Sequence, residues 1–284
     1  MLEHDAGLRL SPQQRRLWSL SRHAGPAIYR IAFAVDLIGL LSRDALAAAL
    51  DTLTRRHEIL RTSLDCPAGL ATAVQIVRED AALALGESDL SELPADRREP
   101  ALAELQRAVS AQVSAAESPP ALHLVRLSDQ QHILLGDLPA LGADGQSVTN
   151  LVAELAQLYG SGPGADAHPG GAGPGAAELD DAVQYADVAE IFNEFLESDE
   201  TATGREYWQR HTTPVLDRAT TAQAYAPQRI PVAIPATLRA GLNDLCREGR
   251  PTSADALLAA WVAVLWRLDM LADDTVYLAY PGRN

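Results

Sequence analysis

The chain has 284 residues, 47% of them hydrophobic, which suffices for one large globular domain or two ordinary ones. Its formal net charge of −15 makes a nucleic-acid backbone an unfavourable partner, and no apolar run approaches the length that spans a bilayer. Cys66 and Cys246 lie far apart without metal-site spacing, and the N-terminus lacks a secretory signal pattern. We therefore expect a cytoplasmic protein that binds no metal and whose partner is a protein or a small molecule.

The first part of the chain predicts alternating helices and strands. Ser11 and Pro12 are typical of the N-cap and the first position of a helix. Larger and smaller or polar residues alternate over 28–37, which predicts a strand. Ser42 caps a second helix, whose apolar stripe has His57 at its edge. Further strands are expected at 60–64, 70–77 and 81–85, and a further helix at 101–113.

The middle of the chain leads to a corner that is rich in glycine. Two strands over 121–127 and 131–138 are predicted to form an antiparallel hairpin. Pro139 ends the second strand, and Gly142 and Gly145 allow the backbone to turn before a helix begins. A loop at a strand end can present side chains to a cleft while the sheet stays rigid. The corner is therefore a candidate catalytic site, and a plain connection between strand and helix is the alternative.

The residues after the corner divide the chain. A helix over 148–158 ends at Gly160, and the Gly-, Pro- and Ala-rich residues beyond it cannot bury apolar surface. We interpret 161–177 as a flexible connector between a first subdomain, 1–160, and the start of a second, 178–284. The second subdomain is predicted to contain helices at 181–196, 202–211, 237–247 and 253–268, and strands at 229–234 and 275–280.

Several motifs, in this order along the chain, resemble the core motifs of nonribosomal peptide synthetase condensation domains. The stretch Ser11–Trp18 resembles the first motif, and Arg56–Thr62 matches the Arg-His-Glu-x-Leu-Arg-Thr motif without a gap. The stretch Tyr185–Ala189 resembles the Tyr-x-Asp-x-Ala motif. The pair Tyr207-Trp208 resembles the Tyr-Trp pair that follows, and Gly282–Asn284 resembles the end of the next motif.

The resemblance implies an α/β fold of the chloramphenicol-acetyltransferase type, with two layers of helices and sheet. It implies two subdomains in a V around a central tunnel, of which 178–284 is a truncated second one. Carrier proteins dock at the two ends of that tunnel. Each brings an acyl or aminoacyl thioester on its own phosphopantetheine, so no cofactor is expected to be bound by the domain itself.

At the corner, this chain departs from the motif that it resembles. The family's catalytic motif is His-His-x-x-x-Asp-Gly, and alignment of its Asp-Gly with residues 144–145 places Pro139 and Ala140 at the histidine positions. Neither side chain can move a proton. His132 lies eight residues before Ala140, which is roughly 26 Å along an extended strand. Asp137 does not match the carboxylate position of related cyclization domains, and we interpret it as a solvated loop acid.

The other motif residues are expected to keep the corner in shape. By resemblance, Arg61 pairs with Asp144 in a charge-assisted hydrogen bond that orders the loop. The amide of Gly145 is expected near the thioester carbonyl, and Ser147 fits a capping role at the helix N-terminus. His57 matches a motif residue that the family uses structurally.

Charge suggests where carrier proteins would dock. An acidic surface repels carrier proteins, which are usually acidic too, so local basic spots are the expected docking sites. The candidates are Arg15, Arg16, Arg22, Arg55 and Arg56. The alternative is that these arginines are ordinary solvated helix residues.

Two classes of function follow from the resemblance. The first is an enzyme of a nonribosomal peptide synthetase that acts on carrier-bound thioesters. Because both histidines are replaced, it would join amine to thioester by positioning alone or run a variant reaction. The second is a non-catalytic platform that recruits carrier proteins or tailoring enzymes. A further alternative is a stand-alone acyltransferase of the same superfamily that uses CoA thioesters, which would need the same missing histidine.

Overall fold

The computed structural model describes residues 7–24, 29–67, 69, 72–79, 81, 83–111, 120–161, 181–210, 232–247 and 252–268. The chain divides into two compact units, Met1–Arg205 and Glu206–Asn284. Apart from Ser161, the connector expected at 161–177 lies outside the described residues, so a subdomain boundary there stays a prediction. In the part of the chain that is described, no helix is long and apolar enough to cross a membrane.

The main sheet of the first unit has four strands in the order β2-β7-β6-β5. They are β2 (Arg30–Ile38), β7 (Gln131–Pro139), β6 (Ala121–Ser128) and β5 (Leu85–Asp89). The pairs β2–β7 and β6–β7 are antiparallel, and β5 pairs with β6 in parallel. The hairpin predicted over 121–138 is confirmed, and β7 ends at Pro139 as expected.

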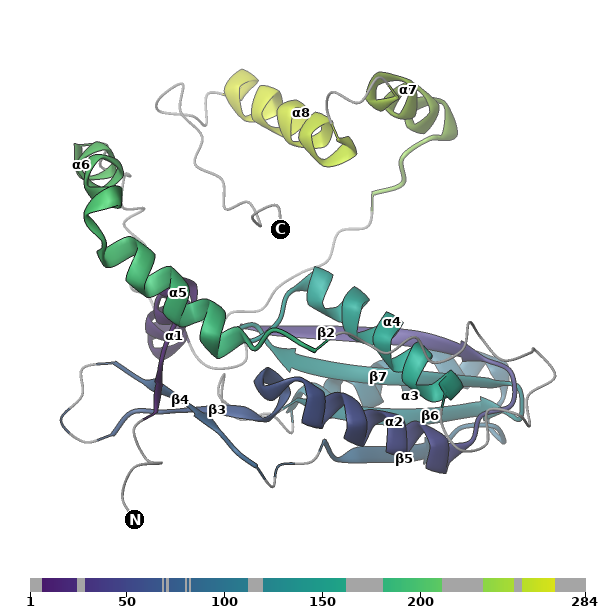
Figure 1. The fold of residues 1–284 in the computed structure, drawn as a ribbon. Helices are drawn as coiled ribbons and strands as arrows, with labels where there is room; N and C mark the ends of the chain where they lie inside the picture. Colours follow the sequence, from purple (N-terminus) through teal and green to yellow (C-terminus); the bar gives the residue numbers. More distant parts are fainter. Residues whose placement is uncertain are drawn as a thin grey trace, which may run out of the picture. The chain divides into compact units, whose positions relative to one another are not determined.

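Helices cover both faces of this sheet (Figure 1). Helices α2 (Arg43–Arg56) and α4 (Gly145–Ser161) pack on one face, and α3 (Ala95–Ala111) packs on the other. Side chains of β6 and β7 alternate between the two faces. The first face buries Leu122, Leu124 and Leu134 against Leu46, Leu50, Leu53 and Leu155. The second face buries Val125, Leu127 and Leu135 against α3.

A smaller sheet has the order β1-β4-β3, with β1 (Leu8–Arg9), β4 (Val74–Val77) and β3 (Thr62–Asp65). The short 3-10 helix η2 (Glu58–Arg61) connects α2 to β3. Helix α1 (Pro12–Ala24) follows β1, and its Trp18 is buried with Leu10 and Leu141. Leu141 belongs to the corner after β7, so this small core anchors the loop of the candidate site.

Helix α5 (Tyr185–Glu197) belongs to the first unit, although it follows the connector in sequence. It packs against β1 and α1, where the Ser11 Oγ and Tyr185 hydroxyls lie 2.9 Å apart. The 3-10 helix η4 (Asp199–Thr201) and helix α6 (Ala202–Arg210) come next. The first unit therefore extends to Arg205 and includes the Tyr-x-Asp-x-Ala motif.

The described part of the second unit consists mainly of α7 (Ala236–Cys246) and α8 (Ser253–Arg267). Helix α8 begins at a capping box in which Thr252 and Asp255 cap each other. Of the strand expected at 229–234, the described residues 232–234 form no strand. The strand expected at 275–280 lies outside the described residues.

Candidate functional site

The corner after β7 is a tight turn that leads into α4. The Ala140 amide donates to the Tyr29 carbonyl at 2.9 Å, and the Gly142 amide donates to the Pro139 carbonyl at 3.0 Å. Gly142 lies against Ile59 of η2, because a Cβ added at Gly142 would lie 2.8 Å from the Ile59 Cγ1 atom. Glycine is therefore needed here for the close approach of the loop to η2.

Asp144 caps α4 from the position just before its first residue. Its Oδ1 atom accepts from the amide and the hydroxyl of Ser147, each at 2.8 Å. In return, the Asp144 amide donates to the Ser147 Oγ atom at 3.1 Å. These hydrogen bonds lower the pKa of Asp144, the backbone amide of Ser147 having the largest effect. Asp144 and Ser147 form a reciprocal cap, so both residues shape the corner.

The expected contact between Arg61 and Asp144 was wrong. Both residues are described, and they share no hydrogen bond or ion pair. Arg61 ends η2, so its guanidinium lies along that turn and donates to the Arg78 carbonyl at 3.3 Å and to Glu58 at 3.4 Å. Its Nε atom is buried without a partner among the described residues. The Oδ1 atom of Asp144 instead accepts both hydrogen bonds of the α4 cap.

Gln14 of the first motif holds the corner from the other side. This buried side chain donates through Nε2 to the Leu141 carbonyl and to Gln75 Oε1, both at 3.0 Å. Its Oε1 atom accepts from the Ser11 amide at 3.0 Å, and the Ser11 hydroxyl accepts from the Gln14 amide at 3.1 Å. Sequence reasoning missed this role. The signal was present, because Ser-x-x-Gln is the pattern of a capping box.

Asp137 is a buried member of β7 and not a solvated loop acid, which corrects the sequence interpretation. Its carboxylate forms an ion pair with the Arg30 Nε atom, and both side chains are less than 5% exposed. The Ser110 hydroxyl of α3 donates to Asp137 Oδ2 at 2.6 Å. Alternation along β7 places Asp137 on the face covered by α3, which explains its burial. Asp137 is thus fully engaged in holding β2, β7 and α3 together.

The Arg-His-Glu segment links three elements. Arg56 Nε donates to Glu154 Oε1 of α4 at 2.6 Å, and His57 Nε2 lies 2.7 Å from Glu154 Oε2. On its other side, Gln184 accepts from the Glu58 amide at 3.0 Å and donates to the Arg56 carbonyl at 3.1 Å. The segment therefore joins the end of α2 to α4 and to the start of α5.

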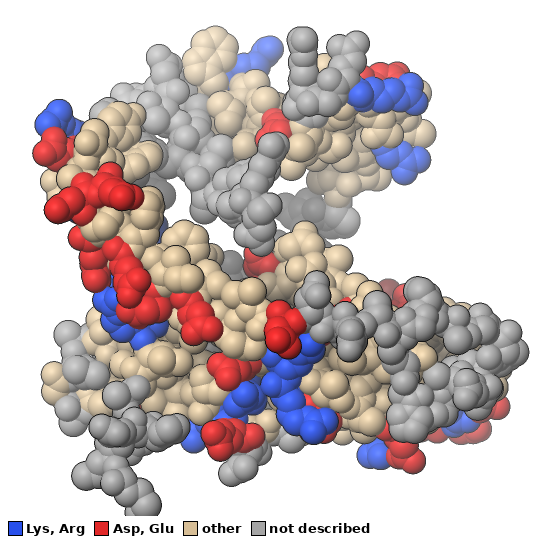
Figure 2. Space-filling view, in the orientation of Figure 1, with Lys and Arg blue, Asp and Glu red and all other residues tan. Residues whose placement is uncertain are grey.

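The arginines proposed for docking differ in their surroundings. Arg15 donates to Asn193 of α5 at 2.8 Å, and Arg55 pairs with Asp51 at 2.9 Å. Arg16 is exposed, whereas the side chain of Arg22 lies outside the described residues. Figure 2 shows blue side chains over the C-terminal end of α2 and red ones along α5 and α6. Docking at any of these arginines stays a prediction.

The corner offers few groups for chemistry. Ala140 carries only a methyl group, and Pro139 lacks even a backbone donor. Gly145 is exposed at the first position of α4, where a helical amide has no intrahelical partner and can bind a carbonyl oxygen. No group of three or more His, Cys, Asp or Glu within the described ranges could hold a metal ion.

Comparisons with known proteins agree on one family. The Condensation domain family matches residues 6–284. The chain is 31% identical to one of the linear gramicidin synthase proteins of Brevibacillus parabrevis over 291 residues, which is 99% of this chain and 4% of that protein. It is 31% identical to the isonitrile lipopeptide synthase of Mycobacterium tuberculosis over 296 residues, which is 99% of this chain and 11% of that protein. The chain thus spans only a small part of the relatives that it matches.

Solved structures share the fold. The SgcC5 protein of Streptomyces globisporus superimposes with a TM-score of 0.69 and 22% identity, covering 93% of this chain and 61% of that one. The starter condensation domain of rhizomide synthetase superimposes with a TM-score of 0.60 and 19% identity, covering 74% of this chain and 48% of that one. The mixed helix and sheet architecture is thus the chloramphenicol-acetyltransferase-like fold that the motifs implied.

Proposed function

Since the chain belongs to the condensation-domain family, we propose that it binds carrier proteins within a nonribosomal peptide synthetase assembly line. Its ligands would be acyl or aminoacyl thioesters on the carriers' phosphopantetheine arms, and its place of action the cytoplasm. We further propose that it is a platform and not an efficient amide-forming enzyme. The observation that carries this proposal is Ala140, which stands where the family's motif has its second histidine.

The frame of the corner is well supported, although it lacks a base. Asp144 and Ser147 cap α4, and Gln14 holds the Leu141 carbonyl. A general base typically contributes about 10²- to 10⁴-fold in rate. A domain with this loop would still accept a phosphopantetheine thioester, but it would lose the rate contribution of a general base.

A second candidate is slow amide formation by positioning. The exposed amide of Gly145 at the start of α4 favours it, because this donor could polarise a thioester carbonyl. Two tethered reactants gain more from alignment than from a single base. A stand-alone acyltransferase with CoA thioesters is less well supported, since it would lose the base without gaining tethered reactants.

Binding to loaded carriers tests the platform. The carrier domains of the same assembly line are charged with an aminoacyl phosphopantetheine whose thioester is replaced by a stable amide. Their affinity for the full chain is measured by interferometry, with the apo carriers as the control. We expect tighter binding of the loaded carriers than of the apo carriers. Equal affinity for both would contradict recognition of the arm at the corner.

Docking through arginine is tested in the same assay. Arg16→Glu should weaken carrier binding at low salt, because Arg16 is exposed on α1 and available to an acidic partner. The matched control is Arg210→Glu, an exposed arginine on α6. If both variants bind as the wild type does, α1 is not the docking surface.

A further inference from the structure

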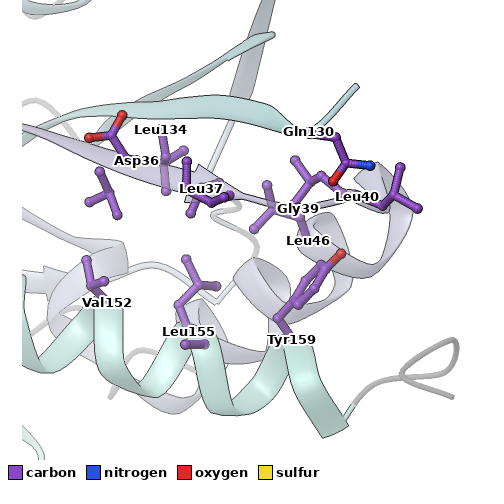
Figure 3. Close-up of a pocket in the computed structure, with 14 residues that line it drawn as sticks. Asp36, Leu37, Gly39, Leu40, Leu46, Gln130, Leu134, Val152, Leu155 and Tyr159 are labelled. Carbon is purple, nitrogen blue, oxygen red and sulfur yellow. The ribbon is translucent and has the colours of Figure 1, made fainter. Parts of the chain in front are cut away.

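A cavity of about 550 Å³ lies in the first unit, away from the corner. It is enclosed by the C-terminal half of α4, the end of β2 and the loop that follows β2 (Figure 3). Its lining includes Leu37, Leu40, Leu134, Val152, Leu155 and Tyr159. Along α4, the lining residues from Val152 to Tyr159 lie about 10 to 21 Å from Gly145, at about 1.5 Å per residue. The cavity is therefore distinct from the candidate site.

The lining selects for an uncharged aliphatic ligand. In Figure 3, Leu37 and Leu134 hang from the strands towards α4, and Val152 and Leu155 point from α4 towards them. Among the described residues that line the cavity, none is Lys or Arg. Asp36 contributes to the lining from β2, but its carboxylate points away from α4, to the other face of the sheet (Figure 3). A carboxylate bound there would lack a cation, which disfavours it.

Hydrogen bonds hold the mouth of the cavity in shape. The Ser42 amide donates to the Tyr159 hydroxyl at 2.8 Å, which ties the start of α2 to the end of α4. The Gly39 amide donates to the Gln130 carbonyl at 2.8 Å, which ties the loop to the β6–β7 hairpin. Gly39 has a φ of +116°, a conformation that other residues resist. The polar atoms of Tyr159 and Gln130 thus lie at the rim of an apolar interior.

We propose that this cavity binds the aliphatic tail of a neutral ligand, such as an alcohol or the acyl chain of an ester, thioester or amide. The volume lies within the range of small-molecule sites in proteins, about 300–1,000 Å³. The tail would lie between β2 and α4, and its polar end would reach the rim, where Tyr159 and Gln130 offer hydrogen bonds. This site is independent of carrier binding and of chemistry at the corner.

Calorimetry with the full chain tests the proposal, with 1-decanol, 1-octanol and sodium decanoate as probes. We expect an affinity gain of about fourfold for each added methylene, because each one buried contributes about 0.8 kcal/mol. Decanol should bind more tightly than decanoate at pH 7. Equal or tighter binding of decanoate would overturn the argument from charge.

Two variants on α4 locate the binding. Ala156 lines the mouth, and Ala153 is exposed on the same helix outside the lining. Ala156→Trp should fill the cavity and weaken decanol binding at least tenfold, whereas Ala153→Trp should leave it unchanged. Equal affinities of the two variants would overturn the site. As a second measurement, a decanol analogue with a diazirine should label peptides around Leu40 and Tyr159, and labelling confined to other apolar surfaces would refute the proposal.

Discussion

Removal of the Asp137 carboxylate should destabilise the first unit severely. In Asp137→Ala, the buried guanidinium of Arg30, with 4% of its side chain exposed, loses this carboxylate but keeps its donation to the carbonyl of residue 137. The Ser110 hydroxyl also loses its acceptor. Removal of the carboxylate beside a buried guanidinium costs far more than a lost surface contact, because the protein interior solvates the remaining charge poorly.

The structure sets the scale of this effect. Breaking a buried ion pair by deleting one partner typically costs about 3–5 kcal/mol. For a unit the size of Met1–Arg205, each kcal/mol lowers Tm by about 2–4 °C. We therefore expect a fall in Tm of roughly 6–20 °C. A solvated loop acid, by contrast, would shift the free energy of unfolding by less than about 0.5 kcal/mol.

The assays are thermal unfolding and urea unfolding of the full chain, both followed by circular dichroism, with hydrogen exchange of β7 peptides to assign the transition to the first unit. The double variant Arg30→Met with Asp137→Leu should recover most of the loss, because an apolar pair of similar volume often replaces a buried ion pair without cost. A loss below about 1 kcal/mol in Asp137→Ala would show that the buried ion pair contributes little to stability. A double variant less stable than the single one would show that an apolar pair cannot replace it.

Three further predictions concern the corner and the sheet. Asp144→Ala should lose about 1 kcal/mol of stability at pH 7, because the cap of α4 is missing. Since the folded pKa of Asp144 is lowered, the difference in stability from wild type should shrink as pH falls below about 4. Urea unfolding measures this difference, with Asp144→Asn as the control. Gln14→Leu should cost about 1–3 kcal/mol of stability, since the Leu141 carbonyl and Gln75 lose their hydrogen-bond donor. Hydrogen exchange of the corner amides should become faster in this variant. Unchanged exchange there would contradict a role of Gln14 in holding the corner. His132 has a buried Nδ1 atom without a partner among the described residues, and burial lowers its pKa. His132→Leu should therefore be at least as stable as wild type, and should lose less stability as pH falls below about 6.5, where the unfolded histidine takes up a proton; a large loss at pH 7 would show that the ring has a structural partner.

Local patterns predicted the elements that depend on neighbours in sequence. Alternation located β2 and the β6–β7 hairpin, and the cap residues located the starts of α1 and α2. These features depend on side-chain period and on capping, both of which act over a few residues. The motifs then identified the family, because their order along the chain is more specific than any one of them.

Long-range contacts were harder to predict. The burial of Asp137 depends on α3, which covers one face of β7, and on Arg30 in a strand far away in sequence. The pairing of Arg61 with Asp144 failed because two local interactions compete with it, the cap of α4 and the turn of η2. In both cases the partner of a charged side chain depends on which groups the fold brings close to it, and the sequence alone does not give these distances.

A single-turnover assay of Ala140→His tests whether the corner keeps its frame but lacks its base. Donor and acceptor carriers are loaded with aminoacyl groups, and the dipeptidyl product is followed by mass spectrometry with wild type, Ala140→His and the control Ala143→His, which alters the same loop outside the motif position. We predict that only Ala140→His forms product faster than wild type, by about 10² or more if the returned imidazole acts as a base. Rapid product formation by the wild type, at about 1 s⁻¹ or above, would contradict the account.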